Sequence, residues 1–287
     1  METVARSVVK KIYPRRDPNS HKGEYGKLLV VAGSEMFTGA PAMIGLAALR
    51  AGCDTVYFAG PTRAMDVTAT FFPTFVSMPL EGKYLDRHHL DLVLDFAKEM
   101  KITGLVIGPG LWRKDSTNKA VIDIIEGFDV PMVVDADAAR AIGAKNKILT
   151  GKEAIVTPHS NEFLDMTGAE VSDKVPERAK AVKDWAKKMG TTILLKGPTD
   201  VVSDGDHVSL NKTGNVNMTK GGFGDMLAGV CGALISRRKD KVSAYDAACA
   251  AAYINGRAGD LASKLAGGGV IPTDAVNKIP DIISGRA

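Results

Sequence analysis

Cysteine is scarce in this sequence of 287 residues, and the three that occur, Cys53, Cys231 and Cys249, are odd in number and widely spaced. That pattern fits neither a disulfide framework nor a zinc ribbon. We interpret them as buried core thiols of a protein in a reducing cytoplasm.

Long hydrophobic runs are also absent. No apolar stretch approaches the roughly eighteen residues that span a bilayer. The first residues include Glu2, Arg6 and Lys10 and lack the apolar core and cleavage site of a signal peptide. We therefore expect a cytoplasmic protein with no membrane partner.

The sequence has no large excess of positive or negative charge. Lys and Arg number 37 against 33 Asp and Glu, a net charge of +4, and no dense basic block accompanies this excess. The two tryptophans, Trp112 and Trp185, provide no stacking ladder for bases. These features exclude nucleic acid as a partner.

Two common phosphate-binding motifs are missing as well. The sequence has no Gly-x-x-x-x-Gly-Lys-Ser/Thr, which excludes a P-loop NTPase, and no Gly-x-Gly-x-x-Gly, which argues against a Rossmann dinucleotide site. Glycine itself is abundant, at 30 of 287 residues, against an average of roughly 7%.

Short apolar runs rich in β-branched residues alternate with helical patterns. The expected strands cover residues 27–32, 55–59, 104–107, 131–135, 154–157 and 191–195. The expected helices cover residues 40–51, 86–100, 116–125, 136–143 and 177–189. This alternation predicts an α/β fold whose mostly parallel sheet is covered by helices on both faces.

The pattern changes after residue 195. Residues 201–203 and 207–210 flank Asp204-Gly205, which predicts an antiparallel hairpin. Two long Ala-rich helices are expected near 222–236 and 243–264. No linker or repeat divides the chain, so we interpret residues 1–287 as one domain.

Polar or glycine-rich segments follow five of the expected strands. They are residues 33–40, 108–110, 135–137, 157–162 and 196–200. Ligands of open parallel sheets bind beyond the carboxyl ends of the strands, so these segments predict a site at that edge.

The sharpest local signal is Gly221-Gly222-Phe223-Gly224-Asp225 at the start of an apolar helix. Glycines let the backbone amides of Gly222, Phe223 and Gly224 converge at a helix N-terminus, which favours an anion. Asp225 is then a candidate general base for a substrate hydroxyl. The alternative is a simple charge complement to the helix dipole.

His159 and Glu162 follow the fifth expected strand. His159 either caps the loop through its ring nitrogens or contacts a ligand. Glu162 either holds a magnesium-bound water beside nucleotide phosphates or places negative charge in the first turn of a helix. The remaining histidines, at positions 21, 88, 89 and 207, lack metal-ligand spacing and are expected at the surface or in turns.

The segment 221–229 resembles the anion-hole motif of ribokinase-like proteins. Further motifs stand at residues 21–26, 38–40, 108–111, 135–137, 157–159 and 196–197. Together they resemble the ADP/ATP-dependent NAD(P)H-hydrate dehydratase family, also described as the YjeF C-terminal or carbohydrate-kinase-related family.

The resemblance implies a ribokinase-like three-layer αβα sandwich and a lyase that uses ADP or ATP, with Mg²⁺. Its substrate would be the S epimer of NADH or NADPH hydrate, and it would release phosphate. The hydrate contacts implied are Ala40, Gly110, His159 and Asp225. The adenine-nucleotide contacts implied are Lys196, Gly197, Pro198, Thr199, Asp200 and Gly224. The resemblance makes Asp225 the base and Glu162 the residue that places magnesium.

Three departures from the family pattern stand out. Phe223 replaces the usual threonine, which puts the nucleotide preference in doubt, and Ser160 replaces a frequent proline. The third is that only about twenty residues precede the matching part, so no N-terminal epimerase domain is expected and a separate epimerase is implied. The family also implies a homotetramer, for which the Ala-rich helices are candidate interfaces.

Two other functions compete with this one. A ribokinase-like kinase for a vitamin precursor or a sugar needs the same base and phosphate cradle, and fold alone does not decide between them. The second is a non-catalytic nucleotide-binding protein, which the presence of Asp225 argues against.

Overall fold

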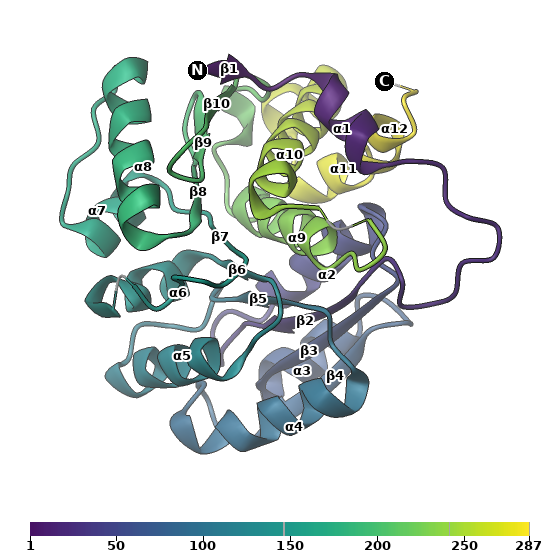
Figure 1. The fold of residues 1–287 in the computed structure, drawn as a ribbon. Helices are drawn as coiled ribbons and strands as arrows, with labels where there is room; N and C mark the ends of the chain where they lie inside the picture. Colours follow the sequence, from purple (N-terminus) through teal and green to yellow (C-terminus); the bar gives the residue numbers. More distant parts are fainter. Residues whose placement is uncertain (146, 241, 287) are drawn as a thin grey trace.

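The computed structural model describes residues 1–145, 147–240 and 242–286. Over these residues one sheet has the strand order β1-β10-β9-β8-β7-β6-β5-β2-β3-β4 (Figure 1). The strands are β1 (Glu2–Thr3), β2 (Lys27–Val31), β3 (Thr55–Pro61), β4 (Val76–Leu80), β5 (Gly104–Ile107), β6 (Met132–Val134), β7 (Ala154–Val156), β8 (Thr192–Leu195), β9 (Asp200–Ser203) and β10 (Val208–Asn211).

Helices cover both faces of this sheet. On one side lie α1 (Arg6–Ile12), α2 (Ala40–Arg50), α3 (Thr62–Ala69), α9 (Phe223–Ile235), α10 (Ala244–Ala266), α11 (Pro272–Val276) and α12 (Ile279–Ile283). On the other lie α4 (Leu90–Met100), α5 (Asp115–Gly127), α6 (Ala136–Ala141), α7 (Ser160–Thr167) and α8 (Val175–Met189). The predicted three-layer αβα sandwich is confirmed.

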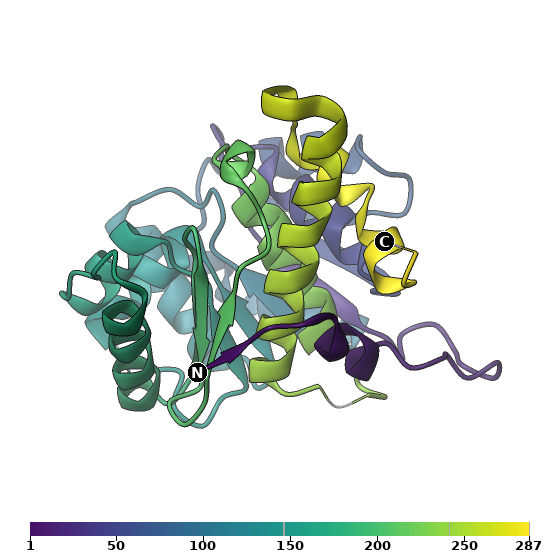
Figure 2. The ribbon, with the colours of Figure 1, turned by 90° about the horizontal axis from the view of Figure 1, so that it is seen from above.

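The pairing of the strands is mostly parallel, as predicted. Strands β8, β7, β6, β5, β2, β3 and β4 pair in parallel in that order. Strand β9 runs antiparallel to both β8 and β10, which confirms the hairpin around Asp204-Gly205. Figure 2 shows β1 beside this hairpin at the edge of the sheet, where it pairs in parallel with β10.

Alternation along β2 explains the two cores. Leu28 and Val30 are fully buried under α2, α9 and α10, whereas Leu29 and Val31 are fully buried under the helices of the opposite face. Successive side chains of a strand point to opposite faces. A strand covered on both faces therefore reads as the continuous apolar run seen in the sequence.

Several elements lie outside the sequence prediction. Helices α1, α3, α11 and α12 and strands β1 and β4 were not expected, and α7 was considered only as an alternative at Glu162. The helix expected over 86–100 begins as a 3₁₀ turn at Arg87–His89 before α4. His89 lies in this turn, which is one of the two places expected for it, but it is not at the surface. Its ring is buried and bonds the Asp86 N–H at 3.1 Å and the Glu81 carbonyl at 2.9 Å, so it caps this turn.

The Ala-rich helices α9 and α10 are packed inside the chain. Ala228 and Ala250 are fully buried, as are most other alanines of these helices, so the alanines pack within the chain. The three cysteines are free and buried, as predicted.

Helix α9 also lies unusually close to α2. A Cβ on Gly229 would contact the Ile44 carbonyl oxygen and would lie 2.9 Å from the Ala47 Cβ. The absence of a side chain at Gly229 therefore sets the distance between the two helices, and with it the position of the α9 N-terminus above the sheet.

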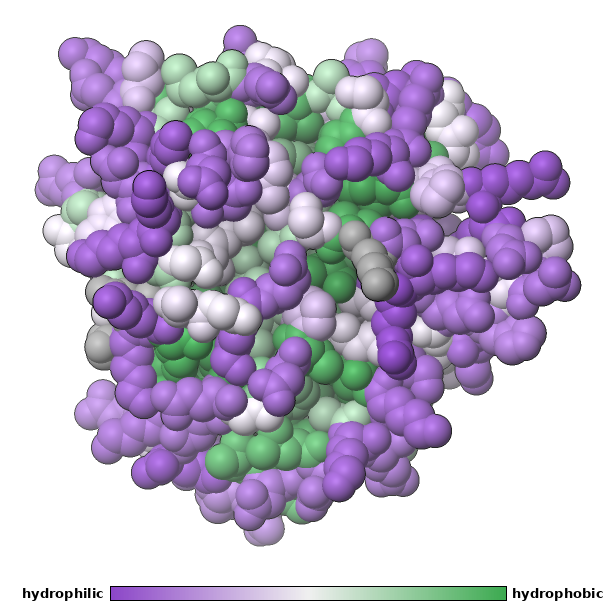
Figure 3. Space-filling model, viewed as in Figure 1, coloured by the Kyte–Doolittle hydropathy of each residue, from purple (hydrophilic) through white to green (hydrophobic). Residues whose placement is uncertain are grey.

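Hydrophilic residues cover most of the face drawn in Figure 3, with smaller hydrophobic areas between them. In the described ranges, no helix is both long and apolar enough to cross a membrane.

We predict that Gly229→Ala lowers the free energy of unfolding by roughly 1–3 kcal/mol, because the added methyl group has no space between the helices. Gly39→Ala is the matched control, since a Cβ there would meet nothing within 4 Å. Denaturant unfolding of the two variants measures the difference. Equal destabilisation by both would contradict this account of the helix contact.

Candidate active site

Three strand ends meet at the carboxyl edge of the sheet. Asp135 directly follows β6, Thr157 follows β7 and Lys196 follows β8. The Thr157 hydroxyl donates to Asp135 Oδ1 at 2.7 Å, and Lys196 Nζ donates to the same oxygen at 3.0 Å. Glu162 Oε2 lies 3.6 Å from Lys196 Nζ. The sheet edge at which the sequence predicts a site therefore holds a compact cluster of charged groups.

The glycine turn brings the α9 N-terminus to this cluster. Gly222 is the N-cap residue and has φ +97°, a left-handed conformation that favours glycine. The next residue, Phe223, is buried as the first residue of the helix. A Cβ on Gly224 would lie only 3.5 Å from Lys196 Nζ. Free amides at a helix N-terminus attract anions, and the Lys196 ammonium adds a full charge there.

Asp225 lies in the first turn of α9 and is partly buried. Burial, followed by the nearby Asp135 carboxylate, raises the pKa of Asp225 to about 7, against the opposing effect of Lys196. A carboxyl with a pKa near neutrality accepts a proton more readily than an ordinary aspartate. The geometry thus suits the predicted general base.

Lys196 keeps its positive charge in this position. Burial lowers the pKa of Lys196, but the carboxylates of Asp135 and Glu162 outweigh that effect and hold the pKa above its usual value. Arg178 supports the same segment, since Nη2 donates to the Lys196 carbonyl at 2.7 Å and Nη1 to Ser160 Oγ at 3.2 Å.

His159 and Glu162 form a reciprocal cap at the start of α7. His159 Nδ1 accepts from the Asn161 and Glu162 amides at 3.1 and 3.2 Å, and Glu162 Oε2 accepts from the His159 amide at 2.9 Å. The proton is therefore left on Nε2, which lies 3.2 Å from Glu162 Oε1. Burial lowers the pKa of His159, so the ring is neutral near pH 7. The capping interpretation of both residues is correct, while half of the His159 side chain remains exposed to a ligand.

A cavity of about 620 Å³ opens beside this cluster. Its walls include Lys196, Gly197, Pro198, Asp200 and Gly224 among the residues predicted to hold the nucleotide. The sixth, Thr199, belongs to the same turn but is not part of the wall. His159 also lines this cavity, together with Phe223 of the glycine turn.

The predicted site residues do not include much of the cavity wall. It comes from the loop after β10, residues 213–216 and 218–220, and from Asn255 and Gly256 of α10. The Asn255 side-chain oxygen is buried and has no hydrogen-bond partner among the described residues. Polar residues within an otherwise Ala-rich helix were the available signal.

Side-chain bonds hold the two loops of the cavity together. Asp200 accepts from the Gly197 amide and from Asn211 Nδ2, each at 3.0 Å. Asp260 of α10 accepts from Asn215 Nδ2 at 2.9 Å. Asp200 therefore shapes the loop, and burial raises the pKa of its carboxyl.

Two further predicted substrate contacts lie together near the loops after β2 and β5. Ala40 is the first residue of α2, and a Cβ on Gly110 would lie 3.6 Å from the Ala40 Cβ. Neither residue belongs to the wall of the 620 Å³ cavity. The predicted substrate residues thus occupy two places, with His159 beside the predicted nucleotide residues.

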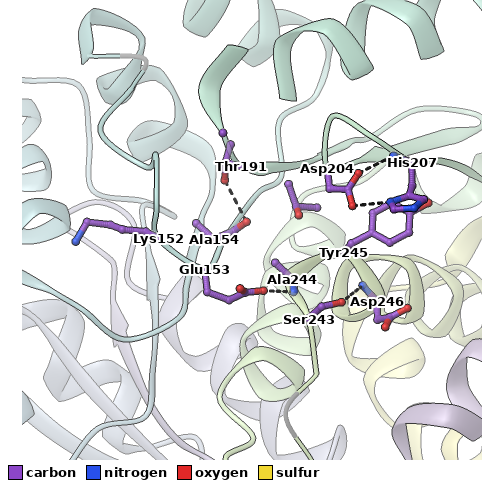
Figure 4. Close-up of a pocket in the computed structure, with 12 residues that line it drawn as sticks. Lys152, Glu153, Ala154, Thr191, Asp204, His207, Ser243, Ala244, Tyr245 and Asp246 are labelled. Atoms are coloured by element: carbon purple, nitrogen blue, oxygen red, sulfur yellow. Dashed lines mark hydrogen bonds and ion pairs between the residues drawn. The ribbon is translucent and has the colours of Figure 1, made fainter. Parts of the chain in front are cut away.

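A second cavity, of about 510 Å³, lies at the opposite edge, between the starts of β7, β8 and α10. Figure 4 shows its polar groups bonded to one another: Glu153 accepts from the Ala244 amide, and Asp204 accepts from His207. Because these groups satisfy each other and lie away from the carboxyl edge, this cavity is not the candidate site.

The sequence and the fold were then compared with known proteins. The model of the NAD(P)H-hydrate dehydratase family matches residues 28–281. The ADP-dependent (S)-NAD(P)H-hydrate dehydratase of Cenarchaeum symbiosum is 36% identical over 278 residues, which are 96% of this chain and 94% of that protein.

Longer relatives match in the same way. The bifunctional NAD(P)H-hydrate repair enzyme Nnr of Pyrobaculum aerophilum is 36% identical over 270 residues, which are 93% of this chain and 52% of that protein. The chain therefore spans about half the length of these bifunctional relatives.

A crystal structure shares the fold. The ADP/ATP-dependent NAD(P)H-hydrate dehydratase of Bacillus subtilis, co-crystallised with ATP and Mg²⁺, is 27% identical, with a TM-score of 0.82 over 99% of this chain and 98% of that chain. The family suggested by the motifs is thereby confirmed: the chain belongs to the NAD(P)H-hydrate dehydratase family.

Proposed function

We propose that this chain is a nucleotide-dependent dehydratase that restores NADH or NADPH from the S epimer of its hydrate, with ADP or ATP as co-substrate. Membership of the family supports this function. The observation that carries it is Asp225, whose pKa is about 7, at a helix N-terminus beside the partly buried Lys196.

The proposed reaction makes a poor leaving group into a good one. The terminal phosphoryl group of the nucleotide is transferred to the C6 hydroxyl of the hydrate, and the hydroxyl proton passes to Asp225. The lone pair of the adjacent ring nitrogen expels phosphate from C6. Loss of a proton from C5 then restores the C5–C6 double bond.

The roles of the residues follow from their positions. We assign the nucleotide to the cavity wall that includes Lys196, Gly197, Pro198, Asp200 and Gly224, with Thr199 in the same turn. We assign the hydrate to Ala40, Gly110, His159 and Asp225. The amides of Gly222, Phe223 and Gly224 would stabilise charge on the transferred phosphoryl group, because donors fixed in advance need no reorganisation during the reaction.

Mg²⁺ fits this site only as an ion shared with the nucleotide. Among the described residues, no group of three His, Cys, Asp or Glu side chains could hold a metal by itself, but Mg²⁺ commonly uses one or two carboxylates together with substrate phosphates and waters. Both oxygens of Glu162 already have protein partners. We therefore propose that Glu162 meets the ion through water, where the ion would neutralise phosphate charge.

Partners and location complete the proposal. We expect a homotetramer that acts in the cytoplasm, with residues 1–287 as one dehydratase domain. We assign conversion of the R hydrate into the S hydrate to a separate epimerase.

The decisive experiment incubates the protein with hydrated NADH and either ADP or ATP. Recovery of the reduced-nicotinamide absorbance, with release of phosphate, is the expected result. No recovery with either nucleotide, together with phosphorylation of a vitamin-precursor alcohol or a sugar, would establish the kinase function instead.

We predict that Asp225→Asn lowers kcat by roughly 10²- to 10⁴-fold, because the base is lost, while ADP binding is retained. In the unmodified protein, kcat/KM should fall as the pH drops below about 7, where Asp225 becomes protonated. Steady-state kinetics across pH measures both effects. Asp95→Asn, at an exposed position of α4, is the control, and unchanged turnover in Asp225→Asn would remove Asp225 from the mechanism.

We predict that Asp225→Asn also increases the free energy of unfolding, by an amount that depends on pH. Since the pKa of Asp225 rises from 3.8 to about 7 on folding, the folded state binds more protons and loses stability as the pH rises through this range. Asparagine cannot ionise, so the advantage of Asp225→Asn in free energy of unfolding should grow from pH 5 to pH 8. A constant or shrinking difference in denaturant unfolding would contradict the raised pKa.

We predict that Glu162→Gln increases the Mg²⁺ concentration required for half-maximal rate. Glutamine can still accept from the His159 amide in the capping box, so the variant removes the charge and keeps the cap. Glu177→Gln is the matched control, since Glu177 lies in the first turn of α8. An Mg²⁺ titration that does not distinguish Glu162→Gln from this control would exclude Glu162 from placing the ion.

A further inference from the structure

An aromatic pair stands at the carboxyl edge of β2 and β5. The rings of Phe37 and Trp112 have centroids 5.7 Å apart and an interplanar angle of 34°. Phe37 is 47% exposed, and Trp112 is partly exposed. The Gly33 amide donates to the Pro109 carbonyl at 2.9 Å, so the two loops are tied together.

This pair borders two of the residues assigned to the hydrate. A Cβ on Gly110 would lie 2.8 Å from the Phe37 Cβ and 3.6 Å from the Ala40 Cβ. Gly110 therefore allows Phe37 to approach the loop after β5. Neither aromatic residue belongs to the wall of the 620 Å³ cavity assigned to ADP or ATP.

The backbone of Trp112 has a strained conformation. Its φ is +75°, a region that bulky residues rarely adopt. The Trp112 amide donates to Asp137 Oδ2 at 3.1 Å, and Asp137 Oδ1 lies 3.5 Å from both Arg113 Nε and Arg140 Nη1. Such strain is concentrated at ligand-binding sites. Glycine would adopt this backbone conformation more easily. The presence of an indole side chain at this position therefore suggests a role for the side chain.

We infer that Phe37 and Trp112 bind a flat heterocyclic ring of the pyridine dinucleotide substrate. The inference rests on the proposed function and adds a ring-binding surface to it. Stacking on an aromatic side chain is available to any flat base, and the exposed pair beside Ala40 and Gly110 supplies such a surface. The ring is either the nicotinamide or the adenine of the dinucleotide.

The test measures binding of NADH by its own fluorescence, without turnover. Trp112→Gly removes the indole and relieves the positive φ, so the fold is retained. Loss of one stacking contact should raise the Kd for NADH roughly tenfold or more, while the Kd for ADP stays unchanged. Phe37→Ala should act in the same direction, and Trp112→Phe should remain close to the unmodified protein.

Phe71→Ala is the control, because Phe71 is 53% exposed in the loop between α3 and β4. Competition by reduced nicotinamide mononucleotide or by AMP identifies the ring: the competitor whose affinity falls in Trp112→Gly is the one that stacks. Unchanged NADH affinity in Trp112→Gly, or no saturable NADH binding by the unmodified protein, overturns the inference. Failure of the proposed function shows separately, as no recovery of hydrated NADH by the unmodified protein.

Discussion

The candidate site depends on one partly buried ammonium group. Lys196 Nζ lies 3.0 Å from Asp135 Oδ1 and 3.6 Å from Glu162 Oε2, so it joins the ends of β6 and β8 to the first turn of α7. Burying a charge is costly unless it is paired, and here two carboxylates face one ammonium. The excess negative charge acts on the neighbouring Asp225, where Asp135 helps burial to raise the pKa. Burial and Asp135 therefore raise the pKa of the proposed base, and the ammonium group that holds the strand ends together opposes them.

The central strands and long helices could be predicted because their burial repeats locally. Strand β2 is apolar throughout, since both of its faces are covered, and α9 and α10 are long and apolar or Ala-rich. Strand β4 contains Pro79 and lies at the edge of the sheet. Proline is tolerated there because an edge strand need not donate on its free side. Residues 76–80 form a strand because they pair with β3, and no local sequence pattern indicates this strand.

The candidate site likewise has parts that local sequence predicts and parts that only tertiary contacts place. The turn Gly222–Asp225 and Lys196-Gly197 were located because their chemistry lies in consecutive residues. The loop after β10 is placed by tertiary contacts instead: it lies against α10, where a Cβ on Gly259 would be 2.9 Å from Met218 Cγ. Glycines within an Ala-rich helix carry no sign of that loop in the sequence. The capping role of His159 was one of two alternatives that the sequence left open, and the first turn of α7 decides in its favour.

A dehydratase and a kinase with this fold differ in their substrates and not in the glycine turn at the start of α9. Both reactions require a base, a cation and helix amides around the transferred phosphoryl group. After transfer, the hydrate loses phosphate because a ring nitrogen adjoins the carbon that carries it, whereas an ordinary alcohol has no such lone pair and keeps its phosphoester. The residues that select the substrate therefore select the reaction. In this chain those candidates include Ala40 and Gly110, which follow the central strands β2 and β5 and lie outside the wall of the cavity beside Lys196.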